Sequence, residues 1–136
     1  KLNPSYALAF NDRGLEFSSK GEFDKAVADY NQALKINPNH SVAYYNRGNL
    51  LRELGRNQEA LQSYDQALKI RPADAESLNN RGNALCELQR YADAVLSFDK
   101  AIALEPYYAD AIENRADALS RQGCERGVDL GIGAGI

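Results

Sequence analysis

One interval governs this sequence, because similar residues return every 34 positions. The segment Asn-Arg-Gly-Asn occupies 46–49 and 80–83, and related segments lie at 11–14 and 114–117. The small residues Gly14, Gly48, Gly82 and Ala116 are each 34 positions apart. A period between about 20 and 50 residues is typical of repeat proteins. Since each unit of such a protein packs only on its neighbours, we expect stacked units rather than one central core.

Within each interval the apolar residues recur three and four positions apart, which indicates helices. Two further columns are small: Ala26, Ala60 and Ala94, then Ala33, Ala67 and Ala101. Large residues fill three others: Tyr30, Tyr64 and Phe98, then Leu34, Leu68 and Ile102, then Ile36, Ile70 and Leu104. Small residues at fixed places let two helices approach closely. We therefore expect two helices in each unit.

Helix-breaking residues lie where these helices should end. Gly21 and Gly55 stand where a left-handed C-cap would form, and Pro38, Pro72 and Pro106 close successive units. The expected helices are 6–20, 23–37, 41–54, 57–71, 75–88, 91–105 and 109–122. Pro4 holds the proline column one unit earlier, so we expect either that the array extends upstream or that the first residues mimic the end of a preceding unit. The predicted fold is all-α, with antiparallel helix pairs stacked into a right-handed superhelix.

The small, aromatic, alanine and proline columns resemble the tetratricopeptide repeat, over about residues 4–122. This resemblance implies a right-handed superhelical solenoid with units 7–40, 41–74 and 75–108 and a partial unit 109–122. Three features depart from the family pattern. Asn57 replaces an aromatic residue, Gln89 replaces the glycine of a turn, and a leucine column holds Arg13, Arg47, Arg81 and Arg115.

The glycine-rich tail 123–136 does not match the repeat. Its five glycines among fourteen residues disfavour a helix. Apolar residues alternate with others, which favours an extended run: Val128, Leu130, Ile132, Ala134 and Ile136. We expect the tail to cover the last helix or to lie on a neighbouring molecule, with disorder as the alternative.

In the family that the chain resembles, the first helix of each unit lines a concave groove. The resemblance implies peptide-binding residues Asn11, Asp12, Tyr45, Asn46, Asn49, Asn79, Asn80, Asn83, Glu113, Asn114 and Asp117. Leu15, Arg52, Cys86 and Arg121 lie in the same columns. An asparagine amide offers one acceptor and two donors, so it can hold both sides of a peptide bond.

Asn46, Asn80 and Asn114 recur once per unit and could form an amide ladder along a bound backbone. The repeat region of O-GlcNAc transferases is similar in this respect, which implies backbone-directed peptide binding. Alternatively, the asparagines solubilise the groove or bond to neighbouring turns. The arginine column could bind carboxylate or phosphate. We favour the alternative that each arginine packs its aliphatic stem between helices and pairs its guanidinium with an acid such as Asp12, Asp65 or Asp99.

The charges in the predicted groove bear on the ligand. Some tetratricopeptide domains hold acidic C-termini with lysine or arginine beside asparagine. Here Asn49 and Asn80 are present, but Tyr45, Glu76 and Asp110 replace the basic partners. We therefore expect no acidic C-terminal ligand, and the acidic end around Asp110, Glu113 and Asp117 favours a basic segment.

Other functions find little support. A net charge of −3 disfavours nucleic acid, and no apolar run reaches membrane length. Cys86 and Cys124 match no metal spacing, and we expect two free thiols in a reducing compartment. Together with the missing signal peptide, this favours the cytoplasm. His40, the single histidine, sits in a turn without an expected partner, and Gly131, Gly133 and Gly135 precede no helix. We expect no enzyme, cofactor or metal.

The sequence thus predicts an interaction scaffold that binds an extended segment of a protein or peptide ligand. Two alternatives remain open. One is the substrate-selecting repeat arm of a larger enzyme, such as a glycosyltransferase. The other is self-association through the incomplete last repeat and residues 123–136.

Overall fold

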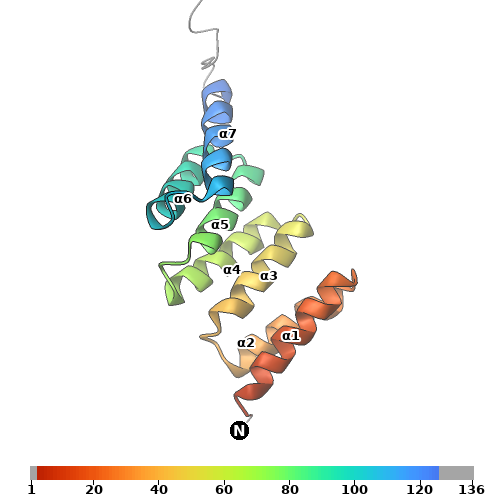
Figure 1. Ribbon diagram of the computed structural model, residues 1–136. Helices are drawn as coiled ribbons and strands as arrows, with labels where there is room; N and C mark the ends of the chain where they lie inside the picture. Colours follow the sequence, from red (N-terminus) through yellow and green to blue (C-terminus); the bar gives the residue numbers. More distant parts are fainter. Residues whose placement is uncertain (1–2, 126–136) are drawn as a thin grey trace, which may run out of the picture. The chain divides into compact units, whose positions relative to one another are not determined.

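The computed structural model describes residues 3–125, which form helices and turns and no strand (Figure 1). The seven helices are α1 (Ser5–Ser19), α2 (Phe23–Ile36), α3 (Ser41–Glu53), α4 (Asn57–Ile70), α5 (Ala75–Glu87), α6 (Tyr91–Leu104) and α7 (Ala109–Glu125). This confirms the all-α fold and each of the expected helices. None of them is both long and apolar enough to span a membrane.

The last helix runs three residues beyond its expected end at position 122 and passes through Gly123. A single glycine in a helix costs at most about 1 kcal/mol, and Gly123 is buried. The prediction from the glycine-rich composition therefore ended this helix three residues too early. Residues 126–136, on which the expected extended run falls, lie outside the described residues.

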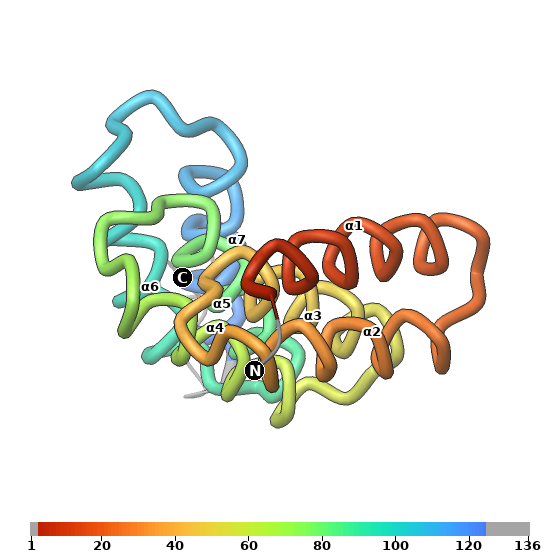
Figure 2. The backbone as a smooth tube through the Cα atoms, turned by 90° about the horizontal axis from the view of Figure 1, so that it is seen from below, coloured from red at the N-terminus to blue at the C-terminus, as the bar shows by residue number. Residues whose placement is uncertain are grey.

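The chain divides into two compact units, Lys1–Pro72 and Ala73–Ile136. In the first unit α1 packs along α2, α3 packs along α4, and α2 also contacts α3. In the second unit α6 packs against both α5 and α7. Figure 2 shows the chain running out along α1 and returning along α2, so the short turn between them joins an antiparallel pair.

The glycine column lies where an aromatic ring of the paired helix meets the backbone. Tyr30, Tyr64 and Phe98 are fully buried against Gly14, Gly48 and Gly82. A Cβ atom would lie 2.7 Å from the Tyr30 ring at position 14 and 2.8 Å from the Tyr64 ring at position 48. Both distances are far inside van der Waals contact. The small residue therefore sets how closely the two helices approach.

Left-handed residues end the first helix of each pair, as expected. Gly21 and Gly55 both have φ +78°, and Gln89 takes the same place with φ +61°. At this third turn the Arg90 N–H donates to the Leu85 carbonyl at 2.8 Å, as in the other two turns. This is the bond pattern of the Schellman motif. Gln89 is thus held in a backbone conformation that disfavours a side chain.

We predict that Gln89→Gly raises the free energy of unfolding by about 1 kcal/mol, because it removes the left-handed strain. Urea unfolding followed by circular dichroism measures the change. Gly55→Gln is the matched reverse variant, since a Cβ there meets nothing within 4 Å, and it should destabilise by a similar amount. A neutral or destabilising Gln89→Gly would contradict this account of the turn.

His40, for which the sequence suggested no partner, caps α3. Its Nδ1 accepts a hydrogen bond from the Ala43 N–H at 3.3 Å, and Asp74 caps α5 in the same way, 34 positions later. Burial lowers the pKa of His40, while Asp12 opposes this shift. Since the capping Nδ1 must be unprotonated to accept, the neutral ring is the capping form.

The pH dependence of stability should follow from this cap. Because the folded state lowers the pKa of His40, its contribution is complete above the ordinary value of about 6.5 and is lost as pH falls below it. The urea midpoint should therefore fall between about pH 7.5 and about pH 5.5. The His40→Asn variant keeps a capping oxygen that does not titrate, so its urea midpoint should fall less over the same pH range. Equal slopes for both proteins would exclude the cap as the cause.

Candidate peptide-binding surface

Asparagine side chains pair between first helices that belong to successive repeats. In the first unit Asn46 of α3 donates from Nδ2 to Oδ1 of Asn11 of α1 at 2.9 Å. In the second unit Asn114 of α7 donates to Oδ1 of Asn79 of α5 at 3.2 Å. Both pairs are 35 positions apart. The same contact therefore occurs once in each unit.

This pairing affects which of the predicted ligand-binding residues are accessible to a ligand. Asn11, Asn46 and Asn79 are buried, and Asn79 also donates to Oδ1 of Asn80 at 3.4 Å. Among the other predicted residues, Tyr45, Asn49, Asn80, Asn83 and Asn114 are half-buried, and Asp12, Glu113 and Asp117 are exposed. The buried amides thus have a structural role, and the half-buried ones present polar groups at the surface. Contact of any of these residues with a peptide stays a prediction.

Tyr64 of α4 organises the exposed face of α3. Its hydroxyl donates to Oδ1 of Asn49 and accepts from Nε of Arg52 at 3.4 Å. The Tyr45 ring lies 6.3 Å from the Tyr64 ring at an interplanar angle of 57°. The sequence assigned Tyr64 only to the core. The one available signal was its hydroxyl, which Phe98 lacks in the same column.

The second unit carries acidic residues that affect neighbouring groups. Burial raises the pKa of Tyr108, and the charges of Glu76 and Asp110 raise it further. Burial likewise raises the pKa of Cys86 to about 11, with Asp117 adding to the shift. Asp117 is partly offset by Arg121, whose Nε lies 3.1 Å away. Negatively charged side chains therefore act on both Tyr108 and Cys86.

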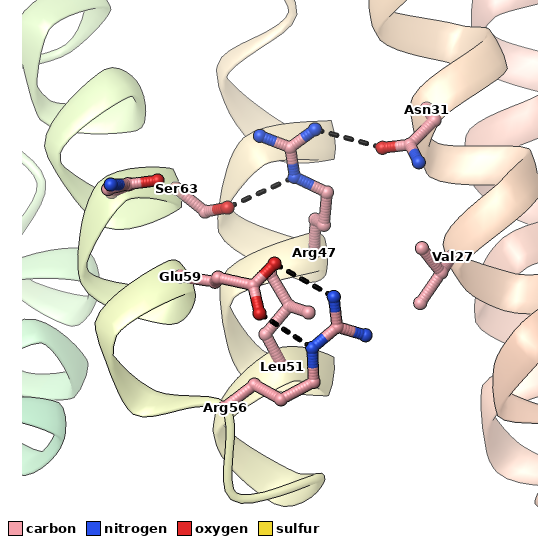
Figure 3. A pocket seen from close by; sticks show the side chains of 8 residues that line it. Val27, Asn31, Arg47, Leu51, Arg56, Glu59 and Ser63 are labelled. Carbon is pink, nitrogen blue, oxygen red and sulfur yellow. Dashed lines mark hydrogen bonds and ion pairs between the residues drawn. The ribbon is translucent and has the colours of Figure 1, made fainter.

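The arginine column ties first helices to second helices. Arg13 holds Asp29 through two bonds of 2.7 and 2.8 Å, and Arg115 pairs with Asp99. This confirms an acid for the arginine head at Asp99, but the partner of Arg13 is Asp29 rather than Asp12. Arg47 donates instead to Ser63 at 3.0 Å and to Asn31 at 2.9 Å (Figure 3).

No group of three or more histidine, cysteine or acidic side chains in residues 3–125 is arranged to hold a metal ion. The polar groups of this surface are mainly amides and carboxylates on helices. Such a surface can bind through hydrogen bonds and charge.

We predict that Asn46→Ala lowers the free energy of unfolding by about 1–3 kcal/mol, because it leaves the buried Asn11 oxygen without its donor. Asn11→Ala should have an effect of similar size, and the double variant should cost less than the sum. Chemical denaturation of all four proteins measures the coupling. Strictly additive effects would show that the pair contributes nothing.

Comparisons with known proteins agree with this arrangement. A family model described as the TPR repeat matches residues 14–51, 48–87 and 82–123. No curated protein sequence matches the chain at a significant level.

Several solved structures are similar to the chain. The first TPR of Spaghetti (RPAP3) bound to the HSP90 peptide SRMEEVD aligns with a TM-score of 0.86 at 20% identity, over 90% of this chain and 97% of that one. The second TPR domain of human RPAP3, in complex with the HSP70 peptide SGPTIEEVD, aligns with a TM-score of 0.82 at 21% identity, over 85% and 98%. The Arabidopsis OM64 TPR domain aligns with a TM-score of 0.79 at 28% identity, over 82% and 93%.

The two RPAP3 likenesses show a shared fold. The family model covers most of the chain, and its three matches begin at the glycines that lie against Tyr30, Tyr64 and Phe98. The chain therefore belongs to the tetratricopeptide repeat family.

Proposed function

We propose that this chain is a protein-interaction scaffold that binds an extended peptide segment. The binding residues would be the polar side chains on α1 and α3 in the first unit and on α5 and α7 in the second. The observation that carries this proposal is the recurrence of half-buried asparagines beside the bonded pairs Asn11–Asn46 and Asn79–Asn114. Helices joined by such pairs hold their surface amides in place, so little receptor entropy is lost on binding.

The solved relatives support peptide binding as the kind of function. RPAP3 domains are described with peptides from HSP90 and HSP70. Both peptides end in the acidic sequence Glu-Glu-Val-Asp. We propose a different ligand charge for this chain, because Glu76, Asp110, Glu113 and Asp117 place negative charge in the second unit. A segment with lysine or arginine would complement these acidic side chains better.

Two peptides of one sequence, differing only by lysine or glutamate at the charged positions, test the proposal by fluorescence anisotropy. The lysine peptide should bind more tightly, and its affinity should fall as salt rises. Glu113→Lys should weaken it, while Lys100→Glu on α6 is a charge-change control outside the proposed face. If neither peptide binds saturably, the choice of a basic ligand is overturned.

The amide contribution needs a variant that leaves the buried pairs intact. Asn83 is half-buried and lies outside the Asn79–Asn114 pair. Asn83→Ala should raise Kd about fivefold, which corresponds to about 1 kcal/mol for one net hydrogen bond. Unchanged affinity in a stable Asn83→Ala protein would remove this residue from the proposed surface.

The recurring asparagines also suit a second role, as the substrate-selecting repeat arm of a larger enzyme such as a glycosyltransferase. The full-length coding sequence discriminates this role by the presence of a catalytic domain. Self-association through residues 123–136 is a separate proposal, which sedimentation with and without those residues tests. A cytoplasmic location stays a prediction.

A further inference from the structure

A polar pocket of about 240 Å³ lies in the first unit among residues of α2, α3 and α4. Figure 3 shows the Arg47 guanidinium between Asn31 and Ser63, and Val27 and Leu51 also line the pocket. Gln62 adds an amide to the lining. The pocket uses other residues than the proposed peptide-binding surface.

Arg47 differs from Arg13 and Arg115, two other arginines of its column, in what it contacts. Arg13 binds Asp29, sixteen positions later, and Arg115 binds Asp99, sixteen positions earlier. The corresponding partners of Arg47 are the hydroxyl of Ser63 and the amide oxygen of Asn31. Arg13 and Arg115 each meet a carboxylate sixteen positions away, whereas Arg47 meets a neutral side chain at both of the corresponding positions. No described residue forms an ion pair with it.

The charge of Arg47 therefore has no ion-pair partner among the described residues, although the guanidinium lies over the Tyr44 ring, 5.4 Å from its centroid. The Arg47 side chain lies partly out of solvent, which lowers the pKa of the guanidinium, while Tyr44 and then Glu59 oppose this shift. The Glu59 carboxylate is itself bound by Arg56 through two bonds of 2.7 and 2.8 Å. The charged side chains of the lining, Arg47, Arg56 and Glu59, leave one net positive charge. A partly buried charge without a counter-ion is unfavourable.

We propose that this pocket binds a carboxylate group, which takes the place beside Arg47 that Asp29 takes beside Arg13. One net positive charge next to Glu59 suits a single negative charge better than a doubly charged phosphate. Guanidinium N–H groups match the two oxygens of a carboxylate. Val27 and Leu51 supply an apolar wall for a short alkyl stem. The carboxylate can come from a glutamate of a partner protein or from a small free acid.

The site is tested by NMR titration of the intact chain at constant ionic strength, with sodium chloride as the reference. The probes are butyrate and a glutamate residue capped by acetyl and amide groups. The signals to follow are Arg47 Nε–H and the side-chain amides of Asn31 and Gln62. Saturable shifts with both probes support the carboxylate site. Shifts with only the capped glutamate or only butyrate also support it, and they identify the source as a protein side chain or a free acid.

Two variants supply the pocket with its own carboxylate, as other repeats have. Ser63→Asp copies Asp29, and Asn31→Asp copies Asp99, which lies two repeats later in the same column. Either variant should weaken probe binding about tenfold or more, while the matched Ser63→Ala and Asn31→Ala should retain it. Asn31 is exposed, so Asn31→Asp keeps the test usable if Ser63→Asp does not fold. Absence of saturable shifts in the original protein, or unchanged affinity in a folded Asp variant, would overturn the proposal.

Discussion

The contact between a glycine and a buried aromatic ring is the interaction on which each helix pair depends. At Gly14 and Gly48 the ring lies so close that a single added methyl group would collide with it. The close approach lets Tyr30 and Tyr64 fill the space between two helices and exclude water from it. In α7 the column holds Ala116, which is exposed, and no later helix in the described part of the chain covers it. A small residue is thus essential only where the ring is present.

Polar pairs join the helix pairs to one another at spacings that follow from the repeat. Asparagines 35 positions apart bond between first helices, and Arg115 bonds to Asp99 of the preceding pair, whereas Arg13 bonds to Asp29 within its own pair. Buried hydrogen-bonding groups are costly when unpaired, so these contacts favour one register between neighbouring repeats. The same pairs hold the half-buried amides at the surface. Stability and the proposed binding surface therefore share residues, which is why the binding tests use Asn83 rather than Asn46.

Small changes within the repeat columns create local differences in side-chain contacts. Where Asp29 and Asp99 neutralise their arginines, Ser63 and Asn31 leave Arg47 without an ion pair. Where Phe98 only packs, Tyr64 adds a hydroxyl that orients Asn49. The scaffold tolerates these changes because the apolar contacts around them are kept. Each repeat can thus present its own chemistry on a common backbone.

The sequence by itself determined the period, the helices and the close approach at the glycines, because these depend on spacing and on residue size within one repeat. It also placed the left-handed turns at Gly21 and Gly55. Only the tertiary structure decided that Asn46 pairs with Asn11, that His40 caps α3 and that Arg47 finds no acid. These outcomes depend on which side chains meet across two helices, and a column of similar residues does not specify their partners.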